Sequence, residues 1–532
     1  MTYDVVIIGG GHNGLTCAAY LAKAGKSVAI FEARSITGGA AVTEEFHPGF
    51  RNSTASYTVS LLNPTVIKDL DLYNHGLKIT ERAMSNFFPH ADGNYLSFPV
   101  NEDEKYREFA RFSQKDADAI TRYEADLELV ADALRDQLLI TPFNPNGGLK
   151  DIIKMAALGL KARKGGGKLQ KLLLDMAAKS AVDFLDLYFE NEHIKAAYAF
   201  DGIVGALASP YDSGTAYVLL HHCFGEVNGK KGVWGHAIGG MGAITDAMRR
   251  VAEKHGVKIF TDSPVEKVLV ENNQATGIRL KDGRTILARA VAANVSPVVL
   301  FRDMVDQHTV DDDFYKRVTG LKCGSGTFRM NVALSELPKF TAVKTMGLSK
   351  DTMQPYHTGG IIIGPDLKYL DQAYLDARTK GWSAKPIIEM LIPSTLDDSL
   401  APKGQHVASL FCQHFSYDLP DDISWDDIRE QVADQIISTV DRYAPNFSDS
   451  VIARQIHTPK DLESKFGLPK GDIFHAQLSL DQLFMARPVL GHADYRMPVK
   501  ALYLCGSGAH PGGGVTGIPG RNASCEILRD QN

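Results

Sequence analysis

The chain has 532 residues, of which 44% are hydrophobic and 23% charged, and its formal net charge is −6. This is an ordinary globular composition, and the acidic balance argues against a general nucleic-acid binder, which usually carries a basic excess. At roughly 150 residues per domain, the length predicts two to four domains. Glycine is unevenly placed: eight of the 48 glycines lie in residues 1–49 and seven in residues 501–520. Such clusters predict two distant places where the backbone approaches another group closely.

Cysteine spacing, apolar runs and ligand patterns exclude several classes of protein. None of the six cysteines shows C-x-x-C spacing, which argues against a zinc ribbon, an iron–sulfur protein and a local dithiol centre. Few cysteines in a long chain favour a reducing compartment. The N-terminus lacks the pattern of a signal peptide, and no run reaches about 18 apolar residues. We therefore expect a cytoplasmic protein, soluble or peripheral to a membrane. No metal site is expected, because adjacent His221 and His222 on a strand would point to opposite faces.

The first 32 residues have the pattern of one β–α–β unit. Tyr3–Ile8 is a short apolar run, as in a buried parallel strand. The loop Gly9-Gly10-Gly11-His12-Asn13-Gly14 follows, and then a predicted helix over Leu15–Ala24 and a second strand over Ser27–Phe31. The loop satisfies G-x-G-x-x-G and stands between a strand and a helix, which is the context that dinucleotide binding requires.

Each glycine of this loop has a physical role in such a site. Gly9 permits the tight turn, Gly11 lets the backbone approach a pyrophosphate, and Gly14 lets helix and strand pack closely. The helix N-terminus offers free N–H groups to the phosphates. Glu32 lies 18 residues after Gly14, where an acid bonds a ribose hydroxyl and disfavours the 2′-phosphate of NADP. The predicted dinucleotide contacts are therefore Gly9, Gly11, His12, Asn13, Gly14 and Glu32. The alternative is a structural glycine-rich turn.

The segment after Glu32 favours FAD over NAD as the bound dinucleotide. Ala33-Arg34 supplies a charged residue, and Gly38-Gly39-Ala40 supplies a glycine pair. This arrangement is typical of flavoproteins similar to glutathione reductase, amine oxidases and phytoene desaturases, in which the glycine pair lets the chain pass close to the FAD pyrophosphate. We expect FAD contacts from Ala33, Arg34, Gly38, Gly39 and Ala40; the alternative is a surface turn.

A second glycine-rich loop lies near the C-terminus. A strand-like run over Ala501–Cys505 leads into residues 506–520, and a predicted helix over Arg521–Arg529 follows. Strand, glycine loop and helix again form an anion-binding arrangement. No further strand follows to complete a second Rossmann unit, so we expect this segment to complete a site built elsewhere.

These motifs together resemble the phytoene-desaturase-like branch of the FAD-dependent amine oxidase superfamily, in particular the subgroup named pyridine nucleotide-disulfide oxidoreductase domain-containing protein 2. The matching stretches cover both ends and the middle of the chain: Gly9–Gly14 with Glu32–Gly39, Gly239–Gly242, Gly471–Pro488 and Leu502–Asn522. The resemblance implies an FAD cofactor, while the cysteine pair of a disulfide reductase and a second NAD-binding glycine motif are absent. Arg521-Asn522-Ala523 stands where phytoene desaturases usually have Ser-Ala-Lys, and this departure disfavours carotenoid desaturation.

The resemblance also assigns places along the flavin. It implies that the turn containing Gly506 and Ser507 lies along the ribityl chain. It further implies that a helix start points at the pyrimidine end of the flavin, with Gly514, Val515, Thr516 and Gly517. A positive helix end there would stabilise the anion of reduced flavin and raise its potential as an electron acceptor.

The middle of the chain adds a second segment on the flavin side. A helix is predicted over Ala243–His255, a strand over Val257–Phe260, and a hairpin over residues 265–280. In related flavoproteins the position of Val265 supplies a backbone clamp on the adenine, and Asn294 returns the chain to the FAD domain. Both are candidate FAD contacts; for Val265 the alternative is a three-stranded excursion without ligand contact.

Residues 100–225 are predicted to be mostly helical, with a basic cluster in residues 150–171. The cluster surrounds the flexible Gly165–Gly167 and consists of Lys150, Lys154, Lys161, Arg163, Lys164, Lys168 and Lys171. One interpretation is a segment that lies on a membrane surface. The other, which the charge pattern favours, is a solvated helical face of a cap domain.

Few side chains are candidates for catalysis, because flavin itself carries out the difficult step. Strands expected around 322–334, 361–363, 387–392 and 406–411 predict the sheet of a substrate domain. His475 alternates with apolar neighbours, which places it with Gln477 and Ser479 on one face of a predicted strand that lines the cavity. By resemblance His475 and His510 lie near the flavin and are the candidate catalytic residues. For each, the alternative is a structural hydrogen bond.

We predict an α/β protein with a Rossmann-type, glutathione-reductase-like FAD domain (1–85, 225–300 and 490–532) and an α+β substrate or cap domain (86–224 and 301–489). The predicted reaction is dehydrogenation of a small apolar or amine-bearing substrate by hydride transfer to flavin, which oxygen or a quinone reoxidises. The alternatives are an amine oxidase, a polyene isomerase or saturase, and a flavin-binding interaction protein with little turnover. The expected partner is a small, apolar substrate, and no nucleic acid is expected. A peripheral membrane contact through residues 150–171 and a homo-oligomer are left open.

Overall fold

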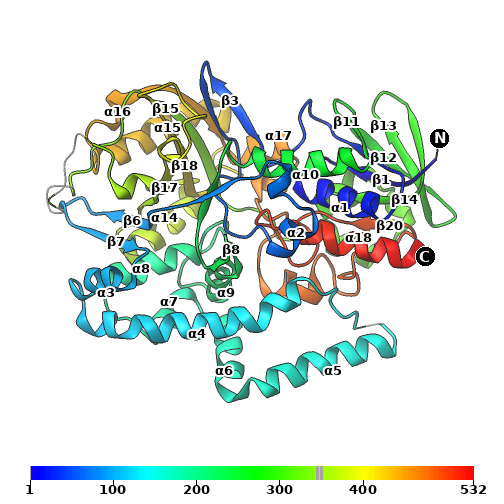
Figure 1. Cartoon of the computed structure of the whole chain (residues 1–532), viewed down its shortest axis with the longest axis horizontal. Helices are drawn as coiled ribbons and strands as arrows, with labels where there is room; N and C mark the ends of the chain where they lie inside the picture. The colour runs from blue at the N-terminus through cyan, green and yellow to red at the C-terminus, as the bar shows by residue number, and fades with distance from the viewer. Residues whose placement is uncertain (1, 146, 343–346, 348–351, 532) are drawn as a thin grey trace.

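The computed structural model describes residues 2–145, 147–342, 347 and 352–531, and within helices the side chains of Lys150 and Ala162 lie outside the description. Two seven-stranded sheets dominate the fold. Figure 1 shows the first on the right, where both termini lie, and the second on the left, with a layer of helices below. This is the predicted combination of an α/β and an α+β part.

The first sheet is largely parallel, and its two N-terminal strands are mostly buried. Its strands, in spatial order, are β11 (Lys258–Phe260), β2 (Val28–Phe31), β1 (Tyr3–Ile8), β14 (Thr285–Ala293), β13 (Gln274–Leu280) and β12 (Val265–Glu271), with β20 (Leu502–Leu504) beside β14. Strands β11, β2, β1, β14 and β20 run parallel to one another, whereas β12 and β13 form an antiparallel hairpin. The apolar run of β1 and the all-buried β2 match the pattern of a central parallel strand.

Three helices pack together beside this sheet: α1 (His12–Lys23), α10 (Gly242–Lys254) and α18 (Ile518–Gln531). Gly520 allows close packing, because a Cβ there would lie 2.1 Å from the backbone oxygen of Asn13. The two ends of the chain therefore meet through α1 and α18. Helix α1 begins at His12 rather than at Leu15, since its first turn starts inside the glycine loop.

The second sheet is mostly antiparallel and contains the four strands expected after residue 320. In spatial order its strands are β19 (Val451–His457), β15 (Thr327–Leu334), β18 (His406–Phe415), β17 (Trp382–Leu391), β16 (Gly360–Ile363), β6 (Met84–Pro89) and β7 (Tyr95–Pro99). One apolar core lies between this sheet and α15 (Trp425–Asp441), with Phe328 and Trp425 among its largest members. A second core includes residues of the sheet and of the helical layer.

The helical layer confirms the helices expected between residues 100 and 225. It consists of α3 (Glu102–Ala110), α4 (Gln114–Leu138), α5 (Leu149–Lys164), α6 (Gly166–Ala178), α7 (Ala181–Leu185), α8 (Glu192–Asp201) and α9 (Thr215–His221), and α14 (Leu367–Lys380) lies against α8. The strand expected at His221 and His222 is wrong: His221 ends α9 and His222 begins a 3-10 turn. No helix in the described residues is long and apolar enough to cross a bilayer.

Small two-stranded sheets connect the two parts of the fold. They are formed by β3 (Thr43–His47) with β4 (Phe50–Ser53), β5 (Ile79–Glu81) with β10 (Gly235–Ala237), and β8 (Glu226–Val227) with β9 (Lys230–Lys231). The residue limits given above for the two domains remain a prediction.

The carboxylate of Asp397 joins these parts. It accepts hydrogen bonds from the Nε2 atom of His236 at 3.2 Å, the backbone N–H of Gly239 at 2.6 Å and the hydroxyl of Ser399 at 2.6 Å. Burial alone would raise the pKa of Asp397, but these hydrogen bonds outweigh burial and hold the pKa well below its usual range. A carboxyl whose pKa is lower in the folded state stabilises the fold above its unfolded pKa of about 3.9, and this contribution is lost as the pH falls below that value.

We expect Asp397→Asn to lower the free energy of unfolding at pH 7 by about 2 kcal/mol, since several hydrogen bonds to a charged group are weakened. The variant should also lose less stability than the wild type when the pH is lowered toward 3. Urea unfolding at a series of pH values measures both effects, with the exposed neighbour Asp398→Asn as the matched control. An unchanged stability and an unchanged acid profile in Asp397→Asn would contradict this assignment.

Candidate functional site

A cavity of about 630 Å³ lies where β1 and β2 end. Ligands of open α/β sheets bind at the carboxyl ends of the strands, and this volume is within the range of small-molecule sites. Residues from four distant parts of the chain meet here. Of the predicted cofactor contacts, those that line the cavity are Gly9, Gly11, His12, Glu32, Ala33, Arg34, Gly39, Ala40, Val265, Asn294 and Ser507, and the candidate catalytic residue His475 joins them.

The first glycine loop forms a close-fitting wall of this cavity. Gly9 has a φ of +92°, a conformation that favours glycine. A Cβ on Gly14 would lie 2.2 Å from the backbone oxygen of Gly9, so only glycine fits there. Gly11 is the N-cap of α1 and contributes no side-chain cap, which leaves N–H groups of the first turn for an anion in the cavity.

The acid and the glycine pair predicted beside this loop are held against it by hydrogen bonds. The Glu32 carboxylate accepts from the backbone N–H of Gly10 at 2.7 Å and from that of Arg34 at 2.9 Å. The backbone N–H of Gly38 donates to the oxygen of Gly10 at 2.9 Å, and a Cβ on Gly39 would lie 3.2 Å from the Cα of Gly11. The 33–40 segment therefore runs alongside the glycine loop, as expected for a chain that passes close to a pyrophosphate.

Asn294 ties the end of β14 to both glycine loops. Its backbone N–H donates to Ile8 at 2.8 Å, and its Nδ2 donates to the oxygen of Gly9 at 3.2 Å. A Cβ on Gly506 would lie 3.1 Å from its Oδ1. At the other end of the cavity, β12 carries one extra residue relative to β13 between Val265 and Lys267. Such a bulge leaves backbone groups unpaired, and these groups are available to a ligand beside Val265.

Several polar atoms around Ser507 are buried without a partner among the described residues. The Nδ2 of Asn13 donates to the hydroxyl of Ser507 at 3.2 Å, and this bond joins α1 to the C-terminal loop. The unpartnered atoms are Oδ1 of Asn13, Nε2 of His12 and Nδ1 of His475. A buried polar atom without a hydrogen bond costs about 1–3 kcal/mol. These atoms therefore favour a polar ligand that enters the cavity between His12, His475 and Ser507.

His475 reaches the cavity from a loop, so the strand predicted around it is wrong. The residue has a φ of +64°, Gln477 donates its side-chain N–H to the oxygen of Gly324 at 3.3 Å, and the Ser479 hydroxyl donates to Asp481 at 2.6 Å. The side chains therefore do not share one strand face. Burial, with smaller effects of Arg487 and His12, lowers the pKa of His475 to about 3. The neutral imidazole is a weak base at pH 7, which favours hydrogen bonding over proton abstraction.

Arg487 lies outside the lining of the cavity and supports the loops that carry His475 and Ser507. It is fully buried and donates hydrogen bonds to the backbone oxygens of Ser507, Phe474, Ala476 and Gln482. Burial lowers the pKa of Arg487 to about 10, so the guanidinium stays charged at pH 7. One cation therefore holds the loop of His475 against the turn of Ser507.

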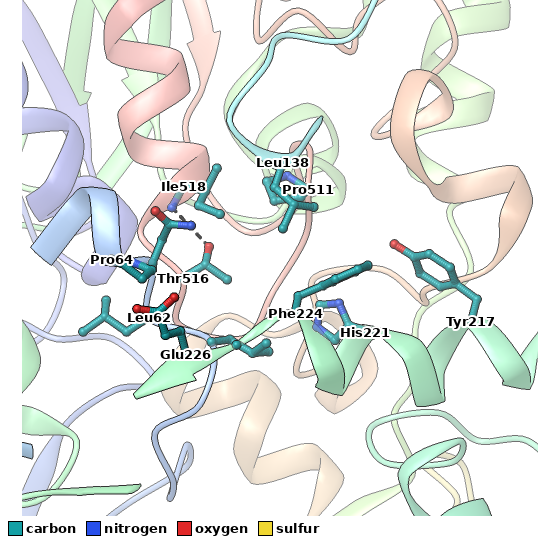
Figure 2. A pocket seen from close by; sticks show the side chains of 13 residues that line it. Leu62, Pro64, Leu138, Tyr217, His221, Phe224, Glu226, Pro511, Thr516 and Ile518 are labelled. Atoms are coloured by element: carbon teal, nitrogen blue, oxygen red, sulfur yellow. Dashed lines mark hydrogen bonds between the residues drawn. The ribbon is translucent and has the colours of Figure 1, made fainter. Parts of the chain in front are cut away.

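Thr516, another predicted flavin contact, lines a second, much smaller cavity of about 20 Å³. Figure 2 shows Thr516 and Ile518 across from the side chains of Tyr217, His221 and Phe224. Thr516 uses its hydroxyl to accept from the backbone N–H of Ile518 at 3.1 Å, which caps α18. Gly514, Val515 and Gly517 adopt positive φ angles of +107°, +58° and +72°. The structure does not bring residues 514–517 into the lining of the large cavity.

His510 also lies outside the lining of the large cavity. Its Nε2 lies 3.0 Å from the backbone oxygen of Gln137, its Nδ1 is buried without a partner, and its ring meets that of Phe484 at 5.3 Å. Burial lowers the pKa of His510 to about 4. Catalytic roles for His510 and His475 remain predictions. In the described residues no group of three or more His, Cys, Asp or Glu is placed to hold a metal.

Reasoning from the sequence missed the side of the cavity that α17 (Pro459–Phe466) forms. Phe466 lines the cavity and stacks on the guanidinium of Arg34, whose carbon lies 5.1 Å from the ring centroid. Arg34 also pairs with Glu44 at 2.7 Å. A proline at residue 459, an acid in the first turn and Gly467 after the last turn are helix signals in the sequence. No sequence signal shows that this helix meets residue 34.

Comparisons with known proteins agree with this geometry. The family model described as flavin containing amine oxidoreductase matches residues 14–327, which is more than half of the chain. Pyridine nucleotide-disulfide oxidoreductase domain-containing protein 2 from Rattus norvegicus is 42% identical, and the match covers 99% of this chain and 94% of that protein. The chain belongs to the flavin-containing amine oxidoreductase family.

Other members and folds are more distant. The phytoene desaturase (lycopene-forming) of a Paracoccus species is 25% identical to this flavin-containing amine oxidoreductase over 98% of this chain and 96% of that one. Cyclohexylamine oxidase from Brevibacterium oxydans shares the fold with a TM-score of 0.58 and 14% identity, with each chain covered completely. The Rossmann-type fold class and the assignment to this superfamily are confirmed.

The cavity fits the cofactor of the family. The glycine loop leaves room where a Cβ would clash, Glu32 lines the cavity beside this loop, and polar atoms without a partner among the described residues lie around Ser507. FAD is the cofactor of this flavin-containing amine oxidoreductase. The residue-by-residue contacts given above remain predictions.

Proposed function

We propose that this oxidoreductase dehydrogenates a small apolar or amine-bearing substrate. The observation that carries the proposal is the large cavity, which the Gly9–Gly14 loop lines and in which the buried, unpartnered polar atoms of His12 and His475 lie beside Ser507 within the described residues. When bound, FAD supplies a two-electron acceptor that takes a hydride from the substrate, whose second hydrogen leaves as a proton, and that dioxygen or a quinone reoxidises.

The side chains around the cavity have positioning roles in this proposal. The first turn of α1 and the Gly38–Gly39 pair hold the pyrophosphate, and Glu32 accepts from the ribose. Val265 contacts the adenine. Asn294 contacts the cofactor where β14 meets the two glycine loops. Ser507, with neutral His475 and His12, hydrogen-bonds polar groups of the ligand beside the C-terminal loop. Gly506 and the segment Gly514–Gly517 complete the cradle on the side of the C-terminal loop.

An anaerobic titration tests the reaction class. We expect the flavin absorbance to bleach when an alkylamine or a cyclic terpene is mixed with the holoprotein without oxygen, and to return when air or a quinone is admitted. Bleaching by amines alone would identify an amine oxidase, and bleaching by terpenes alone an apolar dehydrogenase. A redox-neutral polyene isomerase would convert its substrate without lasting bleaching. The proposed reaction would be ruled out if neither class bleached the flavin while a stable protein partner was recovered.

Three further assignments are part of the same proposal. The FAD domain comprises residues 1–85, 225–300 and 490–532, and the substrate or cap domain comprises the other residues. The protein works in the cytoplasm, where its six cysteines stay free, and it forms a homo-oligomer. It contacts a membrane through residues 150–171, where helix α5 has exposed apolar side chains.

A further inference from the structure

Helix α5 carries a row of apolar side chains that the described residues do not cover. The row is formed by Leu149, Ile152, Ile153, Ala156 and Leu160, which recur at spacings of three and four and therefore share one face of the helix. Leu149 is 72% exposed, Ile153 59% and Leu160 56%. Figure 1 shows α5 projecting from the molecule below α4. We call this row the α5 face.

The exposure of the α5 face is unusual for a helix of this composition. No described side chain of α5 is buried, although an amphipathic helix of a globular protein normally turns its apolar stripe toward the core. Contiguous apolar surface of this kind marks a contact with a partner or a membrane. The 16 residues of α5 span about 24 Å, too short to cross the roughly 30 Å core of a bilayer but long enough to lie along its surface.

Positive charge accompanies the α5 face, although the whole chain is acidic. Arg163, Lys164 and Lys171 are exposed, and no ion pair is found for them within the described residues. Lys168 is exposed as well and pairs with Asp126. An apolar stripe flanked by unpaired lysine and arginine matches an anionic lipid surface, which accepts the apolar side chains and attracts the cations.

Another side of the same helix borders a groove next to His510. The groove has a volume of about 210 Å³, and Ile140, Pro142, Phe143, Ala157, Leu158 and Phe484 form its apolar lining. The ring of Phe484 lies 5.3 Å from that of His510, and Gln137, which also lines the groove, accepts the contact from His510. If α5 lies on a bilayer, this groove begins about one helix diameter, roughly 10 Å, from the lipid.

We propose that the α5 face docks this protein on an anionic lipid bilayer. Ile152, Ile153 and Leu160 enter the acyl region, while Arg163 and Lys164 contact the phosphate and carboxylate groups of the lipids. Docking in this way places the groove of Phe484 beside the membrane, where an apolar substrate could enter it. The docking itself is independent of the flavin chemistry.

Vesicle sedimentation of the holoprotein tests the docking. Two kinds of vesicle are compared, phosphatidylcholine alone and phosphatidylcholine mixed with phosphatidylserine. We expect the wild type to pellet with the mixed vesicles and Ile153→Glu/Leu160→Glu to bind them at least about tenfold more weakly. Arg163→Gln/Lys164→Gln should lose the preference for phosphatidylserine. The matched control, Leu287→Glu/Leu375→Glu, changes apolar positions elsewhere that are also exposed, though somewhat less (48% and 44%), and should bind as the wild type does.

A spectroscopic variant locates the contact. The emission of Ile153→Trp should be quenched by vesicles that contain brominated phosphatidylcholine, whereas that of Leu375→Trp should not. The proposal is overturned if the wild type binds neither vesicle, or if the α5 variant binds as well as the control. It is also overturned if the protein does not bind vesicles and the α5 variant only dissociates a dimer. In that case a second copy of the chain covers the α5 face. Substrate bleaching of the flavin in detergent-free buffer is measured in parallel and separates this failure from a failure of the proposed reaction.

Discussion

Replacing Gly14 with valine should yield a purified protein without bound flavin. A Cβ at this position would lie 2.2 Å from the backbone oxygen of Gly9 and 2.9 Å from the Nδ2 of Asn294. Backbone atoms cannot move aside as the end of a flexible side chain can. To fit valine, the glycine loop must therefore open or α1 must shift. We expect a loss of about 3 kcal/mol in FAD binding, a factor on the order of 100 in affinity. Fluorescence titration of the apoprotein with FAD measures this change.

The controls separate loss of the site from loss of the fold. Gly148→Ala adds a methyl group where no described atom outside its chain neighbours lies within 4 Å, and this variant should bind FAD normally. Glu32→Gln keeps the volume of the side chain and removes its charge, so it should stay folded and bind FAD roughly tenfold more weakly. A Gly14→Val protein that is folded and binds FAD as tightly as the wild type would show that FAD does not lie against this loop.

Arg487→Met should destabilise the fold more than any exposed arginine substitution. The guanidinium is fully buried, and its loss leaves the backbone oxygens of Phe474, Ala476, Gln482 and Ser507 without their donor. Removing one member of such a buried charged network costs about 3–5 kcal/mol of unfolding free energy. Because the network holds Ser507 and the loop of His475 together, FAD affinity should fall with stability. Urea unfolding with and without FAD measures both.

Two control variants of arginine give reference values for the stability loss of Arg487→Met. Arg487→Lys keeps the charge but has one donor group instead of three nitrogens, so its stability should lie between those of the wild type and the methionine variant. Arg317→Met removes an exposed ion pair with Asp313 and should cost less than about 1 kcal/mol. Equal unfolding midpoints for Arg487→Met and Arg317→Met would mean that the buried hydrogen bonds of Arg487 contribute little.

The first sheet was predictable because its signals are local. Tyr3–Ile8 is an apolar run followed directly by the glycine motif, and the structure has a strand with these bounds. The hairpin around Asn272-Asn273 was marked by turn residues, and both residues adopt positive φ angles of +49° and +61°. Glu32 follows its strand at the distance that the motif requires, and it lies against the loop. Each of these features depends on residues that are close in the sequence.

The wrong predictions arose where distant contacts decide the conformation. Residues 474–478 alternate between buried and partly exposed, which is the pattern of a strand, but their carbonyl oxygens bond Arg487 instead of a neighbouring strand. His221 and His222 end a short apolar run, and periodicity alone does not separate a short helix from a strand. Phe466 reaches Arg34 across more than 400 residues of sequence, a contact that no local pattern contains.

The C-terminal loop shows a second limit of prediction from the sequence. Its glycines predicted close backbone approach, and Gly520 does approach α1 closely. A resemblance supplied the role of residues 514–517 at the flavin, and the structure places Thr516 as the cap of α18 beside a small cavity with His221. The hydroxyl that motif reading offers to a ligand thus already accepts a hydrogen bond from a helix terminus. The backbone N–H groups of this loop remain the part of the prediction to test.

The absorption spectrum of the purified protein tests the central claim most directly. We predict a yellow protein whose flavin bands remain after gel filtration, with about one FAD released per chain on denaturation, as expected for a single dinucleotide site. A protein that is colourless, folded and unable to take up added FAD would contradict the assignment of the cavity and the function built on it.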